Sequence, residues 1–298
     1  MNLLVTGANG QVGGELARSL MPLGEVVALD RHACDLARPD TLGALVAALA
    51  PDVIVNAAAY TAVDRAESEE ALATTVNADA PAALARAAHE IGALLVHYST
   101  DYVFGGTKDA PYAEDDPVAP LNAYGRSKLA GERAIAAAGC DHLILRTTWV
   151  YAARGSNFVR TMLRLGGERE ALRVVADQHG APTWARNIAD ATAHIVVQAQ
   201  RERSAGHFAS GVFNLAARGE TTWHGFAEAI FEEARALPCG ARLKVAEVTP
   251  IAGADYPTPA ARPTNSRLAL ARVEARFGIV MPPWRDALRR CLEDVPGG

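Results

Sequence analysis

Tyr124 and Lys128 form a pair that could carry a proton. They stand four positions apart in the segment Tyr124-Gly125-Arg126-Ser127-Lys128, and a helix would place both side chains on one face. A phenol has a pKa of ~10, but a nearby ammonium stabilises the phenolate and lowers that pKa. The pair could therefore protonate a developing alkoxide at neutral pH, although tyrosine and lysine at this spacing are also common on exposed helices.

Thr100 and Asp101 follow a run, Leu94–Tyr98, that is typical of a buried strand. Open parallel sheets bind their ligands at the carboxyl ends of the strands, so both side chains would face a ligand. The Thr100 hydroxyl could bond a substrate carbonyl or Tyr124, although a threonine at a strand end often only caps a turn. We predict that Thr100, Tyr124 and Lys128 form a catalytic set.

A glycine-rich turn follows the first predicted strand, Leu3–Val5, and opens a helix. Gly7, Gly10 and Gly13 have the GxxGxxG spacing, which lets a dinucleotide pyrophosphate approach the backbone N–H groups at the start of the helix. Such a turn can also be a tight connection between a strand and a helix. Its place in the first strand-to-helix turn favours a dinucleotide site.

Asp30 and Arg31 end the second predicted strand and bear on the choice of cofactor. A carboxylate at this point can accept hydrogen bonds from both ribose hydroxyls of the adenosine, as in NADH. The Arg31 guanidinium could instead pair with the 2′-phosphate of NADPH, which Asp30 would repel. The sequence is therefore compatible with NADH, NADPH or both.

The composition indicates a folded protein of the cytoplasm. The 298 residues are 50% hydrophobic and 21% charged, with a net charge of -5 and no Lys/Arg run, so we expect no nucleic-acid partner. The four cysteines are far apart in the sequence, as in a reduced intracellular protein. No segment has the length and apolarity of a membrane span, so we expect no membrane partner.

Strand-like and helix-like segments alternate along the first half of the chain, which predicts an α/β fold with a Rossmann-like, doubly wound parallel sheet. The expected strands are Leu3–Val5, Val26–Leu29, Val53–Asn56, Leu94–Tyr98, Leu143–Arg146 and Leu172–Val175, with helices at Gln11–Leu20, Leu42–Ala50, Glu67–Glu90, Tyr124–Ala138 and Asn157–Leu165. We assign residues 1–176 to the nucleotide-binding domain, with contributions from 185–220, and residues 177–298 mainly to a smaller substrate-binding α/β lobe. That lobe would contain strands Val212–Leu215 and Leu243–Val248 and helices His224–Ala236, Arg267–Phe277 and Pro283–Glu293.

The motifs together resemble the extended short-chain dehydrogenase/reductase family. The resemblance rests on the glycine turn, on Ser99-Thr100-Asp101-Tyr102-Val103-Phe104 and on the Tyr124 to Lys128 segment. More narrowly, the chain is similar nearly end to end to the dTDP-4-dehydrorhamnose reductase family. The narrowing features are residues 56–64 (NAAAYTAVD), 146–151 (RTTWVY), 177–183 (DQHGAPT) and 262–268 (RPTNSRL).

This resemblance implies a role for each site residue. Tyr124 would give the proton, Lys128 would tune Tyr124 and hold the cofactor ribose, and Thr100 would adjust the acidity of the tyrosine. The substrate would contact Thr100, Asp101, Tyr124, Trp149 and Arg262, and the cofactor would contact Gly7, Gly10, Gln11, Val12, Gly13, Asp30, Arg31, Asp35, Leu36, Ala59, Tyr60, Thr61, Tyr124 and Lys128. The activity implied is the NAD(P)H-dependent reduction of the 4-keto group of dTDP-4-dehydro-L-rhamnose, the last step of dTDP-rhamnose synthesis.

Several alternatives stay open at this point. The chain could be a reductase or an epimerase of another nucleotide sugar, although dehydratases carry a Glu soon after the strand-end Thr-Asp, where this chain has Tyr102 and Val103. It could also be a non-catalytic NADP-binding regulatory subunit, because a relative regulates methionine adenosyltransferase. Some family members need Mg²⁺, for which only Glu293 and Asp294 are suggestive ligands. The family contains monomers and dimers, so a homodimer is one expected assembly.

Overall fold

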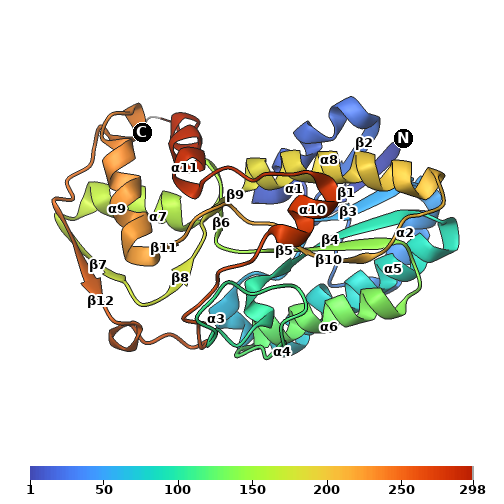
Figure 1. The fold of residues 1–298 in the computed structure, drawn as a ribbon, viewed down its shortest axis with the longest axis horizontal. Coiled ribbons are helices and arrows are strands. Elements are labelled where there is room, and N and C mark those ends of the chain that lie inside the picture. The colour runs from blue at the N-terminus through green and yellow to red at the C-terminus, as the bar shows by residue number, and fades with distance from the viewer. Residues whose placement is uncertain (297–298) are drawn as a thin grey trace.

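The computed structural model of the protein describes residues 1–296, and its centre is a six-stranded, fully parallel sheet (Figure 1). The strands are β1 (Asn2–Thr6), β2 (Glu25–Leu29), β3 (Val53–Asn56), β4 (Leu94–Thr100), β5 (His142–Thr147) and β10 (Gly211–Asn214). Their spatial order is β10-β5-β4-β3-β1-β2. The chain therefore reverses its direction of travel across the sheet between β1 and β3, which is where doubly wound folds bind nucleotides. The predicted fold class is confirmed.

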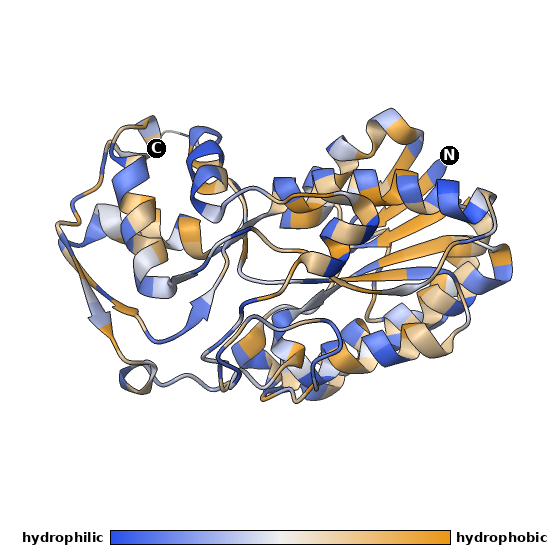
Figure 2. Ribbon diagram, in the orientation of Figure 1, coloured by the Kyte–Doolittle hydropathy of each residue, from blue (hydrophilic) through white to orange (hydrophobic). Residues whose placement is uncertain are grey.

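Helices cover both faces of this sheet (Figure 1). One face packs against α1 (Gln11–Ser19), α8 (Ala185–Ser204) and α10 (Ala271–Phe277), and the other against α2 (Leu42–Leu49), α5 (Ala80–Ile91) and α6 (Ala123–Ala137). The strands between them are hydrophobic along most of their length (Figure 2), as expected for a parallel sheet that is buried on both sides.

A second hydrophobic core lies outside the sheet. It is built on α7 (Phe158–Glu168), α9 (Trp223–Ala234) and α11 (Trp284–Glu293), with residues from Tyr151 to Val295. Short paired strands frame it: β7 (Ala171–Val175) with β12 (Glu247–Ile251), β6 (Val150–Tyr151) with β9 (Thr183–Trp184), and β8 (His179–Gly180) with β11 (Thr221–Thr222). The chain enters this second lobe at about Tyr151, returns to the sheet through α8 and β10, and enters the lobe again at α9.

One predicted strand of the large sheet was wrong. Leu172–Val175 forms most of β7, which pairs with β12 in the second lobe, and the sixth position of the sheet is taken by β10. Leu172–Val175 does not suit the large sheet because it has one exposed face. Residues along β7 alternate between exposed and buried, whereas β3 and β4 are buried throughout. Such alternation is typical of a strand with one solvated face.

The remaining elements differ from prediction in smaller ways. The longest helix, α8, was not predicted, although Ile188, Thr192, Ile195 and Ala199 repeat at helical spacing on its buried face. The predicted helix Glu67–Glu90 is divided into α4 (Glu70–Thr74), a π-helical segment η3 (Thr75–Asp79) and α5, after the short α3 (Val63–Ala66). The described residues 1–296 also contain five 3-10 turns: η1 (Met21–Leu23), η2 (Pro39–Thr41), η4 (Asp101–Val103), η5 (Pro238–Gly240) and η6 (Gly253–Asp255).

Gly131 allows α6 to pack closely on η3, which generates a stability prediction. A Cβ at this position would lie 2.1 Å from the carbonyl oxygen of Asn77, so Gly131→Ala must push the two helices apart. We expect the free energy of unfolding to fall by about 1–3 kcal/mol, measured by urea denaturation. Gly43→Ala in α2 is the matched control, because its Cβ would meet no atom within 4 Å and should stabilise the protein by up to ~1 kcal/mol. Equal stability of Gly131→Ala and the wild type would contradict the packing argument.

Candidate active site at the carboxyl edge of the sheet

The turn after β1 is packed so closely against neighbouring backbone that only glycine fits at Gly7 and Gly13. Gly7 has a φ of +72°, and a Cβ there would lie 2.9 Å from the backbone nitrogen of Ala58, in the loop after β3. A Cβ at Gly13 would lie 2.0 Å from the Gly7 carbonyl oxygen. Gly10 caps α1 with no side-chain hydrogen bond, so the first N–H groups of the helix can meet a phosphate. This cradle fits the pyrophosphate of a dinucleotide.

Four of the predicted cofactor residues lie just after β2. The Asp30 carboxylate accepts hydrogen bonds from the backbone nitrogens of His32 and Ala33 and from Asn9, and these contacts hold its pKa below the ordinary value. The Arg31 guanidinium points to Asp35 at 3.6 Å, and Leu36 is buried in the core. Asp30 is thus kept ionised at the strand end, where an adenosine ribose binds in this fold class.

The other predicted cofactor residues approach from two more loops. Gln11 and Val12 begin α1. The side-chain amide oxygen of Gln11 accepts a hydrogen bond of 3.0 Å from the side-chain amide of Asn157, which caps α7. Ala59, Tyr60 and Thr61 follow β3. The Tyr60 hydroxyl donates to Glu69 rather than pointing freely into the site, and the Tyr60 backbone is held by both polar atoms of the Asn77 amide.

Thr100 ends β4, Asp101 begins the following turn η4, and both side chains are buried. The Thr100 hydroxyl donates to one Asp101 carboxylate oxygen at 3.1 Å and accepts from the Tyr102 backbone nitrogen at 3.2 Å. The other Asp101 oxygen has no hydrogen-bond partner. Burial raises the pKa of Asp101 to about 6, although nearby hydroxyls oppose that rise. An unpartnered buried carboxylate oxygen at a strand end is suited to accept a hydroxyl of a ligand.

Tyr124 and Lys128 both lie on α6, as predicted, and Asn122 caps this helix through the Gly125 backbone nitrogen at 2.8 Å. Burial raises the pKa of Tyr124 to about 12, and a hydrogen bond with Thr100 opposes the rise. The Lys128 amine, which is 2% exposed, donates to the Tyr98 carbonyl at 2.6 Å and lies 3.1 Å from Nε2 of His97. Burial lowers the pKa of Lys128 to about 8.

The pKa of Tyr124 therefore differs from the prediction. We expected Lys128 to lower it, whereas burial without a bonded cation raises it. The reason is that the lysine amine is already committed to β4 through His97 and Tyr98. A tyrosine with a raised pKa keeps its proton at neutral pH, and in that state it can only act as a donor.

Trp149 and Arg262 lie on segments that border the second lobe. The Trp149 ring stacks on Trp223 with centroids 3.6 Å apart, and its backbone has a φ of +44°. A Cβ at Gly180 would lie 2.5 Å from this ring, so Gly180 leaves room for the indole. Arg262 binds both carboxylate oxygens of Asp64, at 3.0 and 2.8 Å, and is therefore less free to bind a diphosphate than the sequence suggested.

Potential metal ligands are not gathered in the described chain. Within residues 1–296 no three His, Cys, Asp or Glu side chains are grouped so that they could hold a metal ion. Asp294 instead pairs with Arg186 at 2.5 Å, and Glu293 lies 3.5 Å from Arg290. Between residues 1 and 296 there is also no helix with the length and apolarity needed to cross a membrane.

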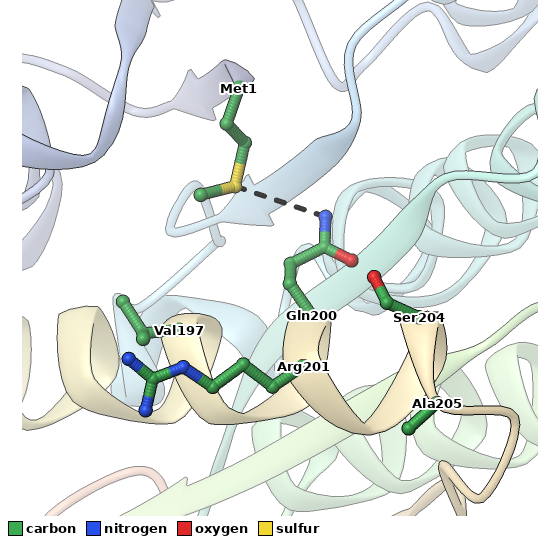
Figure 3. Close-up of a pocket in the computed structure, with 6 residues that line it drawn as sticks. All are labelled: Met1, Val197, Gln200, Arg201, Ser204 and Ala205. Atoms are coloured by element: carbon green, nitrogen blue, oxygen red, sulfur yellow. Dashed lines mark hydrogen bonds between the residues drawn. The ribbon is translucent and has the colours of Figure 1, made fainter.

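A surface hollow lies between the start of the chain and helix α8. It is lined by Met1 and by one side of α8, with Gln200 and Arg201 among the residues drawn in Figure 3. It contains none of the predicted site residues, and a weak contact between Gln200 and the Met1 sulfur crosses it. We assign it no part in the activity.

Three residues that shape the site were not predicted from the sequence. Asn157 holds Gln11, Asn77 holds the loop after β3, and His97 contacts Lys128. Asn157 had a detectable signal, because an asparagine before an apolar periodic segment is a typical helix cap. A histidine inside an apolar strand gives no such signal by itself.

The fold and the arrangement of these groups define a class. A parallel sheet with a glycine cradle at its point of reversal, and with Thr100, Tyr124 and Lys128 brought to the neighbouring strand end, is the architecture of an extended short-chain dehydrogenase/reductase. The chain belongs to the family of the RmlD substrate binding domain, whose model matches residues 1–296.

Similar proteins extend over almost the whole chain. The dTDP-4-dehydrorhamnose reductases of Burkholderia thailandensis and Salmonella typhimurium are 58% and 48% identical to it, covering 99% of this chain and 99% and 98% of their own. A crystal structure of a dTDP-4-dehydrorhamnose reductase from Clostridium acetobutylicum superposes with a TM-score of 0.89 at 35% identity, covering 98% of this chain and 99% of that one. The Bacillus anthracis enzyme in complex with NADP gives 0.86 at 34% identity, covering 97% and 98%.

The raised pKa of Asp101 predicts a measurable pH dependence. A carboxyl that binds its proton more tightly in the folded state than in the unfolded state makes the protein lose stability as pH rises from about 4 to about 6. Asp101→Asn removes that titration. Relative to the wild type, its free energy of unfolding should therefore rise by roughly 1–3 kcal/mol between pH 4 and pH 7 in urea denaturation. A difference that stays constant over this range would show that Asp101 titrates normally.

Proposed function

We propose that this protein reduces the 4-keto group of dTDP-4-dehydro-L-rhamnose to the alcohol of dTDP-L-rhamnose, with NADPH or NADH as the reductant. The observation that carries the proposal is the 58% identity, over 99% of both chains, to a dTDP-4-dehydrorhamnose reductase. Thr100, Tyr124 and Lys128 stand at the strand end where such chemistry occurs in this fold class. The protein is thus a sugar-nucleotide oxidoreductase of dTDP-rhamnose biosynthesis.

The cradle at Gly7, Gly10 and Gly13 would hold the cofactor pyrophosphate on the first N–H groups of α1. Asp30 would accept the adenosine ribose hydroxyls, and Lys128 would donate to the nicotinamide ribose. A reduced nicotinamide supplies the hydride when it is bound. The NADP complex of the Bacillus anthracis relative supports a nicotinamide cofactor, while Asp30 and Arg31 leave NADPH and NADH both in the proposal.

Tyr124 would provide the proton. At a pKa of about 12 the phenol is protonated at neutral pH. It can donate that proton because the alkoxide formed by hydride transfer is a stronger base than a phenolate. The Thr100 hydroxyl would steer the phenol and the substrate oxygen, since it bonds Tyr124 and lies at the end of β4.

The second lobe would hold the sugar nucleotide. Trp223 stacks on one face of the Trp149 ring and Gly180 lies against the ring as well, so Trp149 would meet a ligand at its edge. Asp101 presents an unpartnered carboxylate oxygen, and Arg262 could meet a diphosphate only by exchanging its bond to Asp64. In this proposal residues 1–176, with 185–220, bind the cofactor and residues 177–298 mainly bind the substrate. The proposal also includes a cytoplasmic location and assembly as a homodimer. The four free cysteines support a location in a reducing compartment.

A second substrate deserves a direct comparison. A probable dTDP-4,6-dihydroxy-2-methyloxan-3-one 4-ketoreductase of Streptomyces antibioticus is 40% identical, covering 99% of this chain and 96% of its own. Another dTDP-linked 4-keto sugar is therefore the alternative substrate, and the same set of catalytic side chains would serve it.

The proposal is tested by following NAD(P)H absorbance with purified protein and dTDP-4-dehydro-L-rhamnose. We expect steady consumption of added reductant with at least one of NADH and NADPH, with and without added Mg²⁺. Both dTDP-linked keto sugars are compared at equal concentration. Tight binding of NADPH without reduction of either sugar would favour a regulatory subunit and would contradict the proposal.

Tyr124→Phe tests the proton donor. The substitution keeps the ring contact with Tyr102 but removes the hydroxyl, so we expect kcat to fall by roughly 10²-fold to 10⁴-fold with little change in NADPH affinity. Turnover is measured by absorbance and affinity by NADPH fluorescence. Tyr112→Phe is the control, because it removes a hydroxyl that only receives the Lys108 backbone N–H. Wild-type turnover in Tyr124→Phe would exclude the proposed role.

A further inference from the structure

Three polar side chains form a row across the buried centre of the sheet. Thr6 on β1 is paired in register with Asn56 on β3, and Asn56 is paired with His97 on β4. All three are at most 1% exposed. Because side chains alternate between faces along a strand, the three face the same side as the row of Leu4, Ile54 and Leu95 two positions earlier.

The row is connected by hydrogen bonds from end to end. The Thr6 hydroxyl donates to the Asn56 amide oxygen at 2.6 Å and accepts from the Ala58 backbone nitrogen at 3.3 Å. The Asn56 amide nitrogen lies 3.0 Å from Nδ1 of His97, and the Lys128 amine lies 3.1 Å from Nε2 of the same ring. We call Thr6, Asn56, His97 and Lys128 the polar ladder.

The ladder replaces apolar packing, which carries a cost in stability. At this level of the sheet leucine or valine would contribute burial energy, whereas each buried polar group must find a partner to offset its lost hydration. The preceding row, Leu4 to Leu95, shows that apolar side chains fit this face. The polar row lies at the carboxyl ends of β1 and β3, next to the glycine turn, and at the level of His97 in the middle of β4.

We infer that His97, supported by Asn56 and Thr6, is a positioning residue that fixes the Lys128 amine for its contact with the cofactor ribose. This inference rests on the proposed function and extends it to a residue that touches neither substrate nor cofactor. His97 holds one side of the amine, and the Tyr98 carbonyl holds another, so the remaining N–H has a single direction. The other end of the ladder bonds the Ala58 nitrogen, which faces the Gly7 cradle.

The chemistry of the imidazole suits this position. Burial and the neighbouring Lys128 keep the pKa of His97 well below its ordinary value, so the ring is neutral. A neutral imidazole has one donor and one acceptor nitrogen. Nδ1 accepts from the Asn56 amide nitrogen, whose oxygen already accepts from Thr6, so the ring hydrogen lies on Nε2. The Lys128 nitrogen meets that hydrogen as a neutral amine, the form that its lowered pKa favours. An apolar side chain would leave a buried amine one partner short, which favours rotation of the amine away from the ligand.

Two substitutions at one position separate the two contacts. In His97→Gln the amide group extends to the place of Nε2 and can still meet Lys128, whereas in His97→Asn it ends at the place of Nδ1 and meets only Asn56. We expect His97→Asn to weaken NADPH binding and to lower kcat, each by roughly 10-fold to 100-fold, with His97→Gln within about threefold of the wild type. Binding is measured by NADPH fluorescence and turnover with dTDP-4-dehydro-L-rhamnose.

Thr192→Val controls for the loss of a buried hydrogen bond as such. It removes the 2.7 Å bond between Thr192 and the Tyr98 hydroxyl, a buried contact on the face of the sheet opposite α6, and it leaves the Tyr98 carbonyl that receives Lys128 in place. We expect this variant to lose thermal stability but to keep both NADPH affinity and turnover. If His97→Asn does not fold, Thr6→Val carries the test, because it removes the far end of the ladder and should weaken NADPH binding about threefold.

The possible results test the role of His97 independently of the proposed function. NADPH affinity of His97→Asn equal to that of the wild type, or equal effects of His97→Asn and His97→Gln, would overturn the inference. Loss of affinity in Thr192→Val equal to that in His97→Asn would also overturn it, since stability alone would then explain the result. A wild-type protein that binds NADPH but does not reduce the sugar overturns the proposed function, while the binding measurements still decide the role of His97.

Discussion

The buried amine of Lys128 is the constraint on which the site depends. An amine removed from water must have polar partners, and this one meets them on β4, where the Tyr98 carbonyl accepts from it and the His97 ring contacts it. Those contacts fix helix α6 against the sheet at one level along the strand. Because Tyr124 lies one helical turn earlier on α6, its hydroxyl is thereby set beside Thr100, and the closed packing that makes this possible also raises the pKa of the phenol.

A second constraint acts where the two lobes meet. Trp149 takes a left-handed backbone conformation, which costs a non-glycine residue about 1–3 kcal/mol and is retained only where the surroundings compensate. Here the compensation comes from the stack on Trp223 and from the space that Gly180 leaves. Three segments that are distant in sequence therefore determine one ring orientation.

The sequence allowed much of this architecture to be predicted, for reasons that can be named. Apolar runs with strand spacing located β1 to β5, and the four-residue spacing of Tyr124 and Lys128 placed both on α6. The sheet to which Leu172–Val175 belongs was harder to predict. Its short apolar run is compatible with either sheet, and its place is determined by pairing with β12. Helix α8 escaped notice although its buried face is periodic, since its alanines and charged end weaken the apolar contrast.

The sequence predicted that Tyr124 and Lys128 share one helix, but it did not predict the direction of the Tyr124 pKa shift. The direction of the Tyr124 pKa depends on where the lysine amine is bonded, which is a property of β4 and not of the YxxxK spacing. His97 gave no signal as a single residue within an apolar strand. A role for His97 can be inferred only because Thr6 and Asn56 lie beside it in register, and this arrangement depends on the order of the strands in the sheet.

The path of the chain through the two cores has a consequence for how such a protein can be divided. The second core takes residues from 151 onward, the sheet then reclaims α8 and β10, and the chain returns to the second core at α9. Cutting the polypeptide at any one peptide bond therefore leaves at least one of the halves with an incomplete interior. The sheet and the second lobe therefore cannot be exchanged between relatives as separate units, and their sequences must change together.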